Sequence, residues 1–411
     1  MADNNDELAR LRQELDELDR SLLQTAARRG EIIRAIATAK AARPPEVGLP
    51  PEGESLPSAE VAPLPGAGGG ALSGGRPLFD RERERAVYER ARAFASQIGL
   101  PERLAHQLMQ ALIERSHQIQ EEVSRQAAMQ QAAESRKRFL IVGGQGRMGR
   151  LLGGELAARG HEIDVLEADD DRDRVQAVGE AQIVLIAVPM GAARAVVEEL
   201  APHVRPDALL CDINSLKQGV CEAMAEHCRG ESMGMHPMFG PTVYSLRRQK
   251  VVVCPVRPGE LATWLRDELG RMGLEIIETD PVTHDRMMAV VQVLVHYSTL
   301  VMGEALRSTG VSIEESLRFT SPIYRLELAF VGRLFAQSAD LYAEIEMTNP
   351  HADEFRHCFL EAAGIFNRAI RTGDHESFRS LFEGISEYFR GFADEAMQLS
   401  DFIIDTLVMQ P

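Results

Sequence analysis

The N-terminal segment carries apolar residues at alternating intervals of three and four positions. This spacing is the period of one face of an α-helix, and it is kept by Leu8, Leu11, Leu15, Leu18, Leu22, Ile33 and Ile36. No proline interrupts residues 8–40, so the pattern predicts a single helix about 50 Å long. A helix of that length needs partner helices, and we expect some of them to come from a second chain.

Residues 43–75 differ in composition from their surroundings. They hold seven prolines and eight glycines and almost no large apolar residue. Such a stretch cannot bury a core, so we expect a flexible linker. Helical patterning returns at residues 80–99 and continues from Pro101 to residue 135. The first module is therefore predicted to be all-helical, with the linker inserted in it.

Short β-rich runs alternate with helical stretches from residue 138 onwards. The β-rich runs are RFLIV, HEIDVLEA, AQIVLIAVP, ALLCDIN and ESMGMHP. This alternation predicts a doubly wound, mostly parallel sheet. After Pro281 the pattern is helical to the end of the sequence. We predict a multidomain chain with an all-α module at 1–134, an α/β domain at 135–280 and an all-α domain at 281–411.

Composition narrows the classes of function. Acidic residues outnumber basic ones by 62 to 45, and this net charge of −17 argues against nucleic acid or an anionic membrane as the main partner. The N-terminus lacks the pattern of a signal peptide, and the longest apolar run, residues 289–302, is too short to span a membrane. Five cysteines without a CxxC pair argue against a disulfide scaffold or a metal site. We expect a soluble, cytoplasmic protein.

A glycine-rich turn follows the first β-rich run. Its glycines are Gly144, Gly146 and Gly149, in the pattern GxGxxG between an apolar strand and a helix. A lone GxGxxG is often an ordinary turn, but here a second strand follows and ends in Glu167. Together these features form the Rossmann fingerprint, in which the glycines and the helix N-terminus receive a pyrophosphate and the acid binds the ribose hydroxyls.

The acid also indicates which dinucleotide binds. The carboxylate of Glu167 would repel a 2′-phosphate and therefore favours NAD over NADP. Arg172 and Arg174, a few residues further on, point the other way. We predict NAD as the cofactor, and the set of residues that bind it also includes Arg147, Met148, Val188 and Pro189.

Dehydrogenation of an alcohol needs a base for the hydroxyl proton. His236 ends a predicted strand in GMHPMFGP, and in such sheets the carboxyl ends of strands face the ligand crevice. The alternative is a packed histidine beside Pro237. His296 lies within a helix that is apolar nearly all round, where a histidine of the core is the ordinary interpretation.

Five basic residues occupy segments that are otherwise apolar. Arg325 and Arg333 flank an apolar stretch and need anionic partners; Glu327 could serve one of them, and a substrate carboxylate the other. On the first helix, Arg29 and Lys40 fall within the apolar stripe and Arg12 at its edge. Cations there are costly unless an anion binds beside them. A coiled coil whose long side chains reach the rim explains the three helix residues equally well.

The sequence resembles the bifunctional chorismate mutase/prephenate dehydrogenases of tyrosine biosynthesis over nearly its whole length. The N-terminal similarity lies in LRQELDELDRSLL, ARRGEI, RPLFDRERERAVYER and IERSHQIQ. The later similarity lies in IVGGQGRMGRL, AVPM, DINSLK, MHPMFGP and SPIYRLELAFVGRLFAQ. This sequence departs from the family at the linker. In other members only a short turn separates the positions of Lys40 and Asp80, whereas here residues 43–75 lie between them.

For the helical module the resemblance implies a chorismate mutase site. The Claisen rearrangement of chorismate needs no acid, base or nucleophile, only a pocket that holds a dianion in its compact conformer and stabilises the ether oxygen. The implied carboxylate ligands are Arg12 (from the partner subunit), Arg29 and Arg83. Lys40 and Gln120 would stabilise the ether oxygen, and the hydroxyl would bind Glu84 and the backbone of Asp80. Ser116 completes the implied set.

For the rest of the chain the resemblance implies prephenate dehydrogenase. His236 would deprotonate the 4-hydroxyl while hydride leaves for NAD and the ring carboxylate departs as CO₂. Arg333 would hold a substrate carboxylate, and the supporting residues would be Ser215, Lys217, His296 and Arg325. The family also implies a homodimer formed by the C-terminal helices, and inhibition by tyrosine.

Three alternatives remain open at this point. The helical module could be a structural dimerisation arm of a protein with dehydrogenase activity alone. The whole chain could be a non-catalytic NAD-binding regulator. The substrate could be arogenate, the amino analogue of prephenate, or the cofactor NADP.

Overall fold

The computed structural model describes residues 2–41 and 81–408. The predicted linker at 43–75 and Asp80 lie outside these described residues. The chain divides into two compact units, Met1–Arg136 with Gly154–Glu162, and Lys137–Gly153 with Ile163–Pro411. The sheet and the C-terminal helices belong to the same unit. This division therefore does not test the domain boundary that we predicted at residue 280, which stays a prediction.

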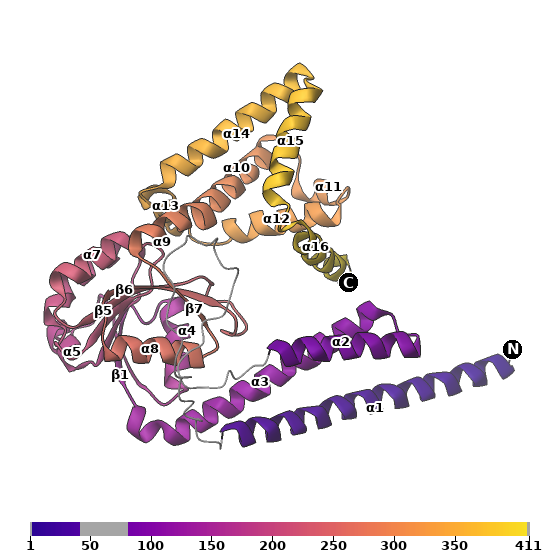
Figure 1. Cartoon of the computed structure of the whole chain (residues 1–411), viewed down its shortest axis with the longest axis horizontal. Helices are drawn as coiled ribbons and strands as arrows, with labels where there is room; N and C mark the ends of the chain where they lie inside the picture. The colour runs from indigo at the N-terminus through magenta and orange to yellow at the C-terminus, as the bar shows by residue number, and fades with distance from the viewer. Residues whose placement is uncertain (1, 42–80, 409–411) are drawn as a thin grey trace, which may run out of the picture. The chain divides into compact units, whose positions relative to one another are not determined.

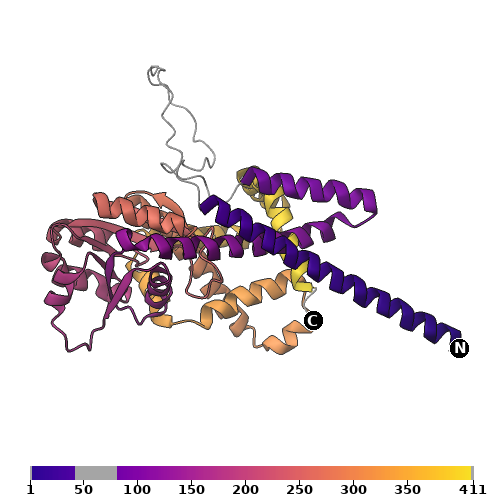
Figure 2. The same cartoon turned by 90° about the horizontal axis from the view of Figure 1, so that it is seen from below.

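Three long helices form the described part of the first unit. They are α1 (Ala2–Ala41), α2 (Arg81–Ile98) and α3 (Glu102–Ser135). The single long helix predicted from the apolar period is confirmed, and at 1.5 Å per residue α1 is about 60 Å long. Both α1 and α2 pack on α3, while the N-terminal part of α1 extends beyond the other two helices (Figures 1 and 2).

The leucine stripe of α1 is exposed in the single chain. Leu11, Leu15, Leu18 and Leu22 are between 50 % and 62 % accessible to solvent. Burying one leucine contributes roughly 1.5–3 kcal/mol. Covering these four side chains would therefore stabilise the protein substantially. Such a stripe is what the sequence led us to expect of a helix that packs against a second chain.

A seven-stranded sheet forms the centre of the second unit. The strands are β1 (Arg138–Val142), β2 (Glu162–Leu166), β3 (Ile183–Ile186), β4 (Leu209–Asp212), β5 (Glu231–Pro237), β6 (Lys250–Arg257) and β7 (Glu275–Glu278). Their order is β2-β1-β3-β4-β5-β6-β7. Strands β1, β3, β4 and β5 are parallel, as predicted, whereas β6 runs antiparallel to β5. The carboxyl ends of β1 and β5 therefore meet at one edge of the sheet.

Helices cover both faces of this sheet. They are α4 (Arg147–Ala157), α5 (Arg174–Glu180), α6 (Met190–Leu200), α7 (Gln218–His227) and α8 (Glu260–Arg271). One face packs against α5, α6 and α7 through a continuous apolar core that includes Val142, Ile186 and Leu210. The alternate side chains point to the opposite face, where Phe139 contacts Trp264 of α8 at 6.3 Å between ring centroids. Burial on both faces explains why these strands are apolar throughout.

The described chain beyond residue 280 is helical, as the sequence predicted. The elements are α9 (Pro281–Met288), a π-helical turn (Ala289–Leu294), α10 (Val295–Ser308), α11 (Ile313–Leu317), α12 (Pro322–Phe335), α13 (Ala339–Thr348), α14 (Ala352–Thr372), α15 (His375–Phe389) and α16 (Ala393–Val408). Figure 1 shows them in orange to yellow. Large apolar side chains are exposed on several of them, including Ile323, Phe382 and Tyr388.

The continuous helical stretch Pro281–Ser308 is longer than the apolar run noted in the sequence. By length and composition alone it could cross a membrane. Its first turns, however, carry His284 and Asp285, both buried and hydrogen-bonded to other parts of the second unit. Such paired ionisable groups are rare on a lipid-facing surface, but only 11 % of the most apolar window of this stretch is buried within the described chain.

Candidate active sites

The turn after β1 is shaped by its glycines. Gly143 has a φ of +79°, and a Cβ atom there would lie 2.8 Å from the carbonyl oxygen of Ala187. A Cβ on Gly144 would lie 2.8 Å from the side chain of Val165, and one on Gly149 would lie 2.8 Å from the Cα of Gly144. Glycine at these positions lets the turn pack tightly against the neighbouring backbone and leads directly into the N-terminus of α4, the end of a helix that attracts a pyrophosphate.

Glu167 lies at this turn and is bonded to it. Its Oε1 accepts a hydrogen bond from the backbone amide of Gln145 at 2.7 Å. The two arginines that complicated the cofactor assignment are engaged elsewhere, because Arg172 binds Asp164 and Asp170 while Arg174 pairs with Glu199 at 3.1 Å. The contacts with Asp170 and Asp164 raise the pKa of Arg172 above its ordinary value. The turn therefore fits NAD, with an acid at the ribose position.

His236 is held by a chain of buried side chains. It ends β5 and is 3 % exposed, and its Nδ1 lies 3.0 Å from Nε2 of His284. The Nδ1 of His284 lies 2.7 Å from Oδ1 of Asp285. The two carboxylate oxygens of Asp285 accept the backbone amides of Lys217 and Gln218 at 2.8 and 3.0 Å. The chain Asp285–His284–His236 thus connects the start of α7 to the end of β5.

This chain determines where the protons lie on both imidazoles. As a carboxylate Asp285 only accepts hydrogen bonds, so Nδ1 of His284 is the donor, and in the neutral form of His284 its Nε2 is the acceptor. Nδ1 of His236 then donates to His284, which leaves the lone pair on Nε2 of His236. Burial, with smaller contributions from His284 and Lys217, holds the pKa of His236 well below its ordinary value of 6.5. His236 is therefore neutral at neutral pH, with Nε2 as its basic atom.

Lys217 is fully buried beneath this site. Its ammonium pairs with Asp212 at the end of β4 and donates to the carbonyl oxygen of Met235 at 2.8 Å. Burial raises the pKa of Asp212, and the neighbouring ammonium of Lys217 opposes that shift. In this position Lys217 ties β4 to β5, and its charge is met by Asp212.

The side chain of Gln292 lies on the basic side of His236. It comes from the π-helical turn, and its Nε2 lies 3.4 Å from Nε2 of His236. Its Oε1 is buried and has no hydrogen-bond partner within 2–41 and 81–408. π-Helical turns are often found at functional sites because they redirect side chains within a helix. Of the contacts that His236 makes in the described chain, none is to Ser215, which is half-buried between β4 and α7.

Helices α10, α12 and α13 bring a second group of residues together. The ring of His296 meets that of Tyr342 edge-on, with 4.9 Å between centroids, and burial lowers the pKa of His296. Burial raises the pKa of Tyr342, and the charge of Arg333 opposes this shift. Arg325 and Arg333 are exposed, and within the described chain neither has a carboxylate at salt-bridge distance, including that of Glu327.

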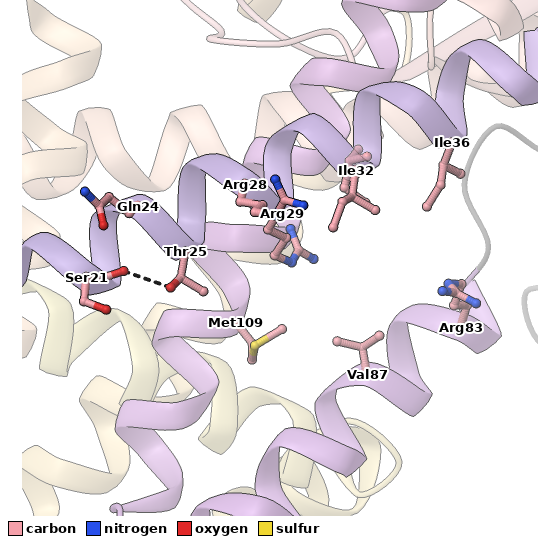
Figure 3. Close-up of a pocket in the computed structure, with 11 residues that line it drawn as sticks. Ser21, Gln24, Thr25, Arg28, Arg29, Ile32, Ile36, Arg83, Val87 and Met109 are labelled. Carbon is pink, nitrogen blue, oxygen red and sulfur yellow. Dashed lines mark hydrogen bonds between the residues drawn. The ribbon is translucent and has the colours of Figure 1, made fainter. Parts of the chain in front are cut away.

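The first unit contains a cavity of about 620 Å³ between its three helices (Figure 3). Arg29 from α1 and Arg83 from α2 line it, together with apolar side chains such as Ile32, Val87 and Met109. Arg29 donates to the carbonyl oxygen of Leu112 at 2.6 Å and to the hydroxyl of Ser116. Partial burial lowers the pKa of Arg29. With Arg28, three guanidinium groups line this otherwise mostly apolar cavity, which suits a small molecule with carboxylates.

Comparison with known proteins relates three regions of the chain to known families. Residues 11–121 match Chorismate mutase type II, residues 154–266 match Prephenate dehydrogenase, nucleotide-binding domain, and residues 280–384 match Prephenate dehydrogenase, dimerization domain. The T-protein of Haemophilus influenzae is 29 % identical over 393 residues, which are 95 % of each chain. This chain belongs to the bifunctional chorismate mutase/prephenate dehydrogenase family.

Two further relatives resemble only the dehydrogenase part. A probable arogenate/prephenate dehydrogenase of Methanocaldococcus jannaschii is 30 % identical over 289 residues, 66 % of this chain and 65 % of its own. The crystal structure of prephenate dehydrogenase from A. aeolicus in complex with hydroxyphenyl propionate and NAD+ is 17 % identical, with a TM-score of 0.49 over 62 % of this chain and 98 % of that one.

The structure brings together only some of the residues that we predicted for the mutase site. Arg29, Arg83 and Ser116 lie at or beside the cavity, and Glu84 lies next to Arg83 in α2. Gln120 is half-buried in α3, and its Oε1 has no hydrogen-bond partner among the described residues. Arg12 and Lys40 are exposed on α1. Asp80 lies outside the described residues.

Sequence reasoning did not find four residues of the dehydrogenase site. Gly143 precedes the fingerprint, and only its positive φ marks it. His284 and Asp285 follow a helix cap and belong to no motif that we used. Gln292 lies within the apolar run 289–302, and an amide side chain in such a run was itself a signal.

Proposed function

We propose that the helical unit rearranges chorismate to prephenate, and that the second unit oxidises prephenate to 4-hydroxyphenylpyruvate with His236 as the base. The observation that carries the proposal is the buried chain Asp285–His284–His236, which leaves a neutral Nε2 at the edge of the sheet where the glycine-rich turn also lies. Ligands of such sheets bind at this edge.

In the dehydrogenase step, Nε2 of His236 takes the proton of the 4-hydroxyl group of prephenate. The C4–H electron pair leaves as hydride, the C4–O bond becomes a carbonyl, and loss of the ring carboxylate as CO₂ makes the ring aromatic. NAD, when bound at Gly143–Gly149 and Glu167, supplies the hydride acceptor. The guanidinium of Arg333 would hold a carboxylate of the substrate, supported by Arg325 and His296.

In the mutase step, the protein contributes positioning and charge. Arg29 and Arg83 would bind the two carboxylates of chorismate in the cavity of Figure 3. Lys40 and Gln120 would stabilise the ether oxygen as its bond breaks, and Glu84 would bind the hydroxyl group. The exposed Arg12 and leucine stripe of α1 support a homodimer in which Arg12 reaches the partner's cavity. We also propose a cytoplasmic location and inhibition by tyrosine.

A single assay tests both activities. The purified chain is given chorismate and NAD, and the loss of chorismate and the gain of NADH are followed together. Both should change, with NADH lagging behind. Arg29→Ala should lower the mutase rate on the order of 100-fold or more and leave oxidation of added prephenate intact. His236→Asn should abolish NADH formation while NAD still binds. A wild-type chain that consumes neither chorismate nor added prephenate would refute the proposal.

The choice between prephenate and its amino analogue arogenate needs a test of its own. The relative from M. jannaschii is named a probable arogenate/prephenate dehydrogenase, so the same dehydrogenase fold is associated with both substrates. Arogenate offered in place of prephenate should give a kcat/KM below that of prephenate. A higher value would replace prephenate with arogenate in the proposed function.

A further inference from the structure

A buried histidine of α3 is bonded to one of the residues expected to bind chorismate. Nε2 of His117 lies 2.7 Å from Oε1 of Glu84, across the interface between α3 and α2. The side chain of His117 is 7 % exposed and that of Glu84 is 19 % exposed. A charge-assisted hydrogen bond this well shielded from water is among the strong ones.

The neighbouring residue of α3 holds a residue of opposite charge. Ser116 accepts a hydrogen bond from Arg29 of α1, and its own hydroxyl donates to the carbonyl oxygen of Leu112 at 2.6 Å. Consecutive residues of a helix point about 100° apart. Ser116 and His117 therefore hold Arg29 and Glu84 on two different sides of α3.

A site that binds a dianion needs its own carboxylate, here that of Glu84, to stay apart from the guanidinium of Arg29. A carboxylate close to the guanidinium groups of Arg29 and Arg83 is attracted to them. There it would neutralise the charge that the carboxylates of the substrate require. A carboxylate bonded through one oxygen to an imidazole keeps acceptor capacity on its other oxygen, so it can still receive a hydroxyl group.

We propose that His117 is a positioning residue of the mutase site, which holds Glu84 on another side of α3 from Arg29 and oriented to accept the substrate hydroxyl. The inference rests on the proposed mutase function of the helical unit. His117 does not touch the reacting atoms; it acts through Glu84. The substrate hydroxyl does not take part in the bond changes, so this interaction contributes equally to the ground state and the transition state.

The test uses the full chain and substitutes each partner of the pair. His117→Leu removes the donor, and the mutase KM for chorismate should rise about 10- to 100-fold, the range that one hydrogen bond to a charged group carries, with kcat nearly unchanged. His117→Gln keeps an N–H donor of similar reach and should recover most of the loss. In a chain that already carries Glu84→Gln, His117→Leu should have little additional effect, because the pair acts as a unit.

Two controls separate this role from general destabilisation. His106→Leu makes the same substitution at an exposed position of α3 and should leave KM unchanged. Oxidation of added prephenate should be equal in all variants. A His117→Leu chain with wild-type KM, or effects of His117→Leu and Glu84→Gln that simply add, would overturn the role of His117 alone. A wild-type chain without any mutase rate would overturn both this role and the proposed mutase function.

Discussion

Nδ1 of His236 and Nε2 of His284 lie 3.0 Å apart in the core of the second unit, with Asp285 bonded to the far nitrogen of His284. Because Asp285 only accepts hydrogen bonds, it determines which nitrogen of each neutral imidazole donates to the next group in the chain. It delivers a neutral imidazole with its lone pair directed to the substrate side. It also makes the catalytic atom dependent on a residue 48 positions away in the sequence.

Removing the middle of this chain should lower catalysis without affecting cofactor binding. In His284→Leu the acceptor for Nδ1 of His236 is lost, so the imidazole is free to adopt the other tautomer and to rotate. We expect the dehydrogenase kcat to fall on the order of 100-fold, with the dissociation constant for NAD unchanged. Steady-state kinetics with prephenate and a titration of NAD measure the two quantities. An unchanged kcat would show that the tautomer of His236 does not depend on His284.

The low pKa of His236 predicts the pH profile of the dehydrogenase. A base must be neutral to accept a proton, so kcat/KM, which reports the free enzyme, should stay level as the pH falls through 6.5 and should decrease only at lower pH. Burial is the main cause of the lowered pKa, so a profile with its midpoint at 6.5 or above would contradict the buried site.

The same group links protonation to stability. The unfolded chain gains a proton on this histidine near pH 6.5, whereas the folded chain does so only at lower pH. The free energy of unfolding should therefore decrease as the pH falls below 6.5. Melting temperatures of the wild type and of His236→Asn, measured between pH 7 and pH 5, should converge as the pH is lowered.

Glu346 of α13 should destabilise the protein at high pH. It is 7 % exposed, and burial raises its pKa from 4.5 to about 7, while the charge of Arg356 opposes the shift. The folded chain thus keeps a proton that the unfolded chain has lost between these values, and stability falls as the pH rises from 4.5 through 7. Glu346→Gln should melt higher than the wild type at pH 8, with a smaller difference at pH 5. Glu354→Gln, an exposed acid of α14, should show no such trend.

Glu167 should determine the preference for NAD. Glu167→Gln keeps an acceptor for the backbone amide of Gln145 and removes the negative charge. We expect the ratio of kcat/KM for NADP to that for NAD to rise roughly tenfold, since repulsion of the 2′-phosphate is relieved. Kinetics with both cofactors give this ratio. If it does not change, Glu167 serves the shape of the turn alone.

Much of the fold could be read from periodicity. The spacing of the leucines predicted α1, and the alternation of strands and helices predicted the parallel part of the sheet, because both patterns are local consequences of backbone geometry. Strand β6 was not predicted, since its antiparallel pairing with β5 is not encoded in a local pattern. Nor did the sequence indicate that its helical stretch from Pro281 contains a π-helical turn, which places Gln292 beside His236.

The sequence by itself determined the domain types, the glycine turn with its acid, and the candidates His236 and Arg29, because each depends on residue type and on spacing along the chain; Arg83 came from the family resemblance. The tertiary structure decided which side chains meet. It bonds His236 to His284 instead of Ser215, pairs the buried Lys217 with Asp212, and joins His117 to Glu84. The contacts of His236 and His117 join residues 48 and 33 positions apart in the sequence, and only the packing of helices and strands brings them within hydrogen-bond distance.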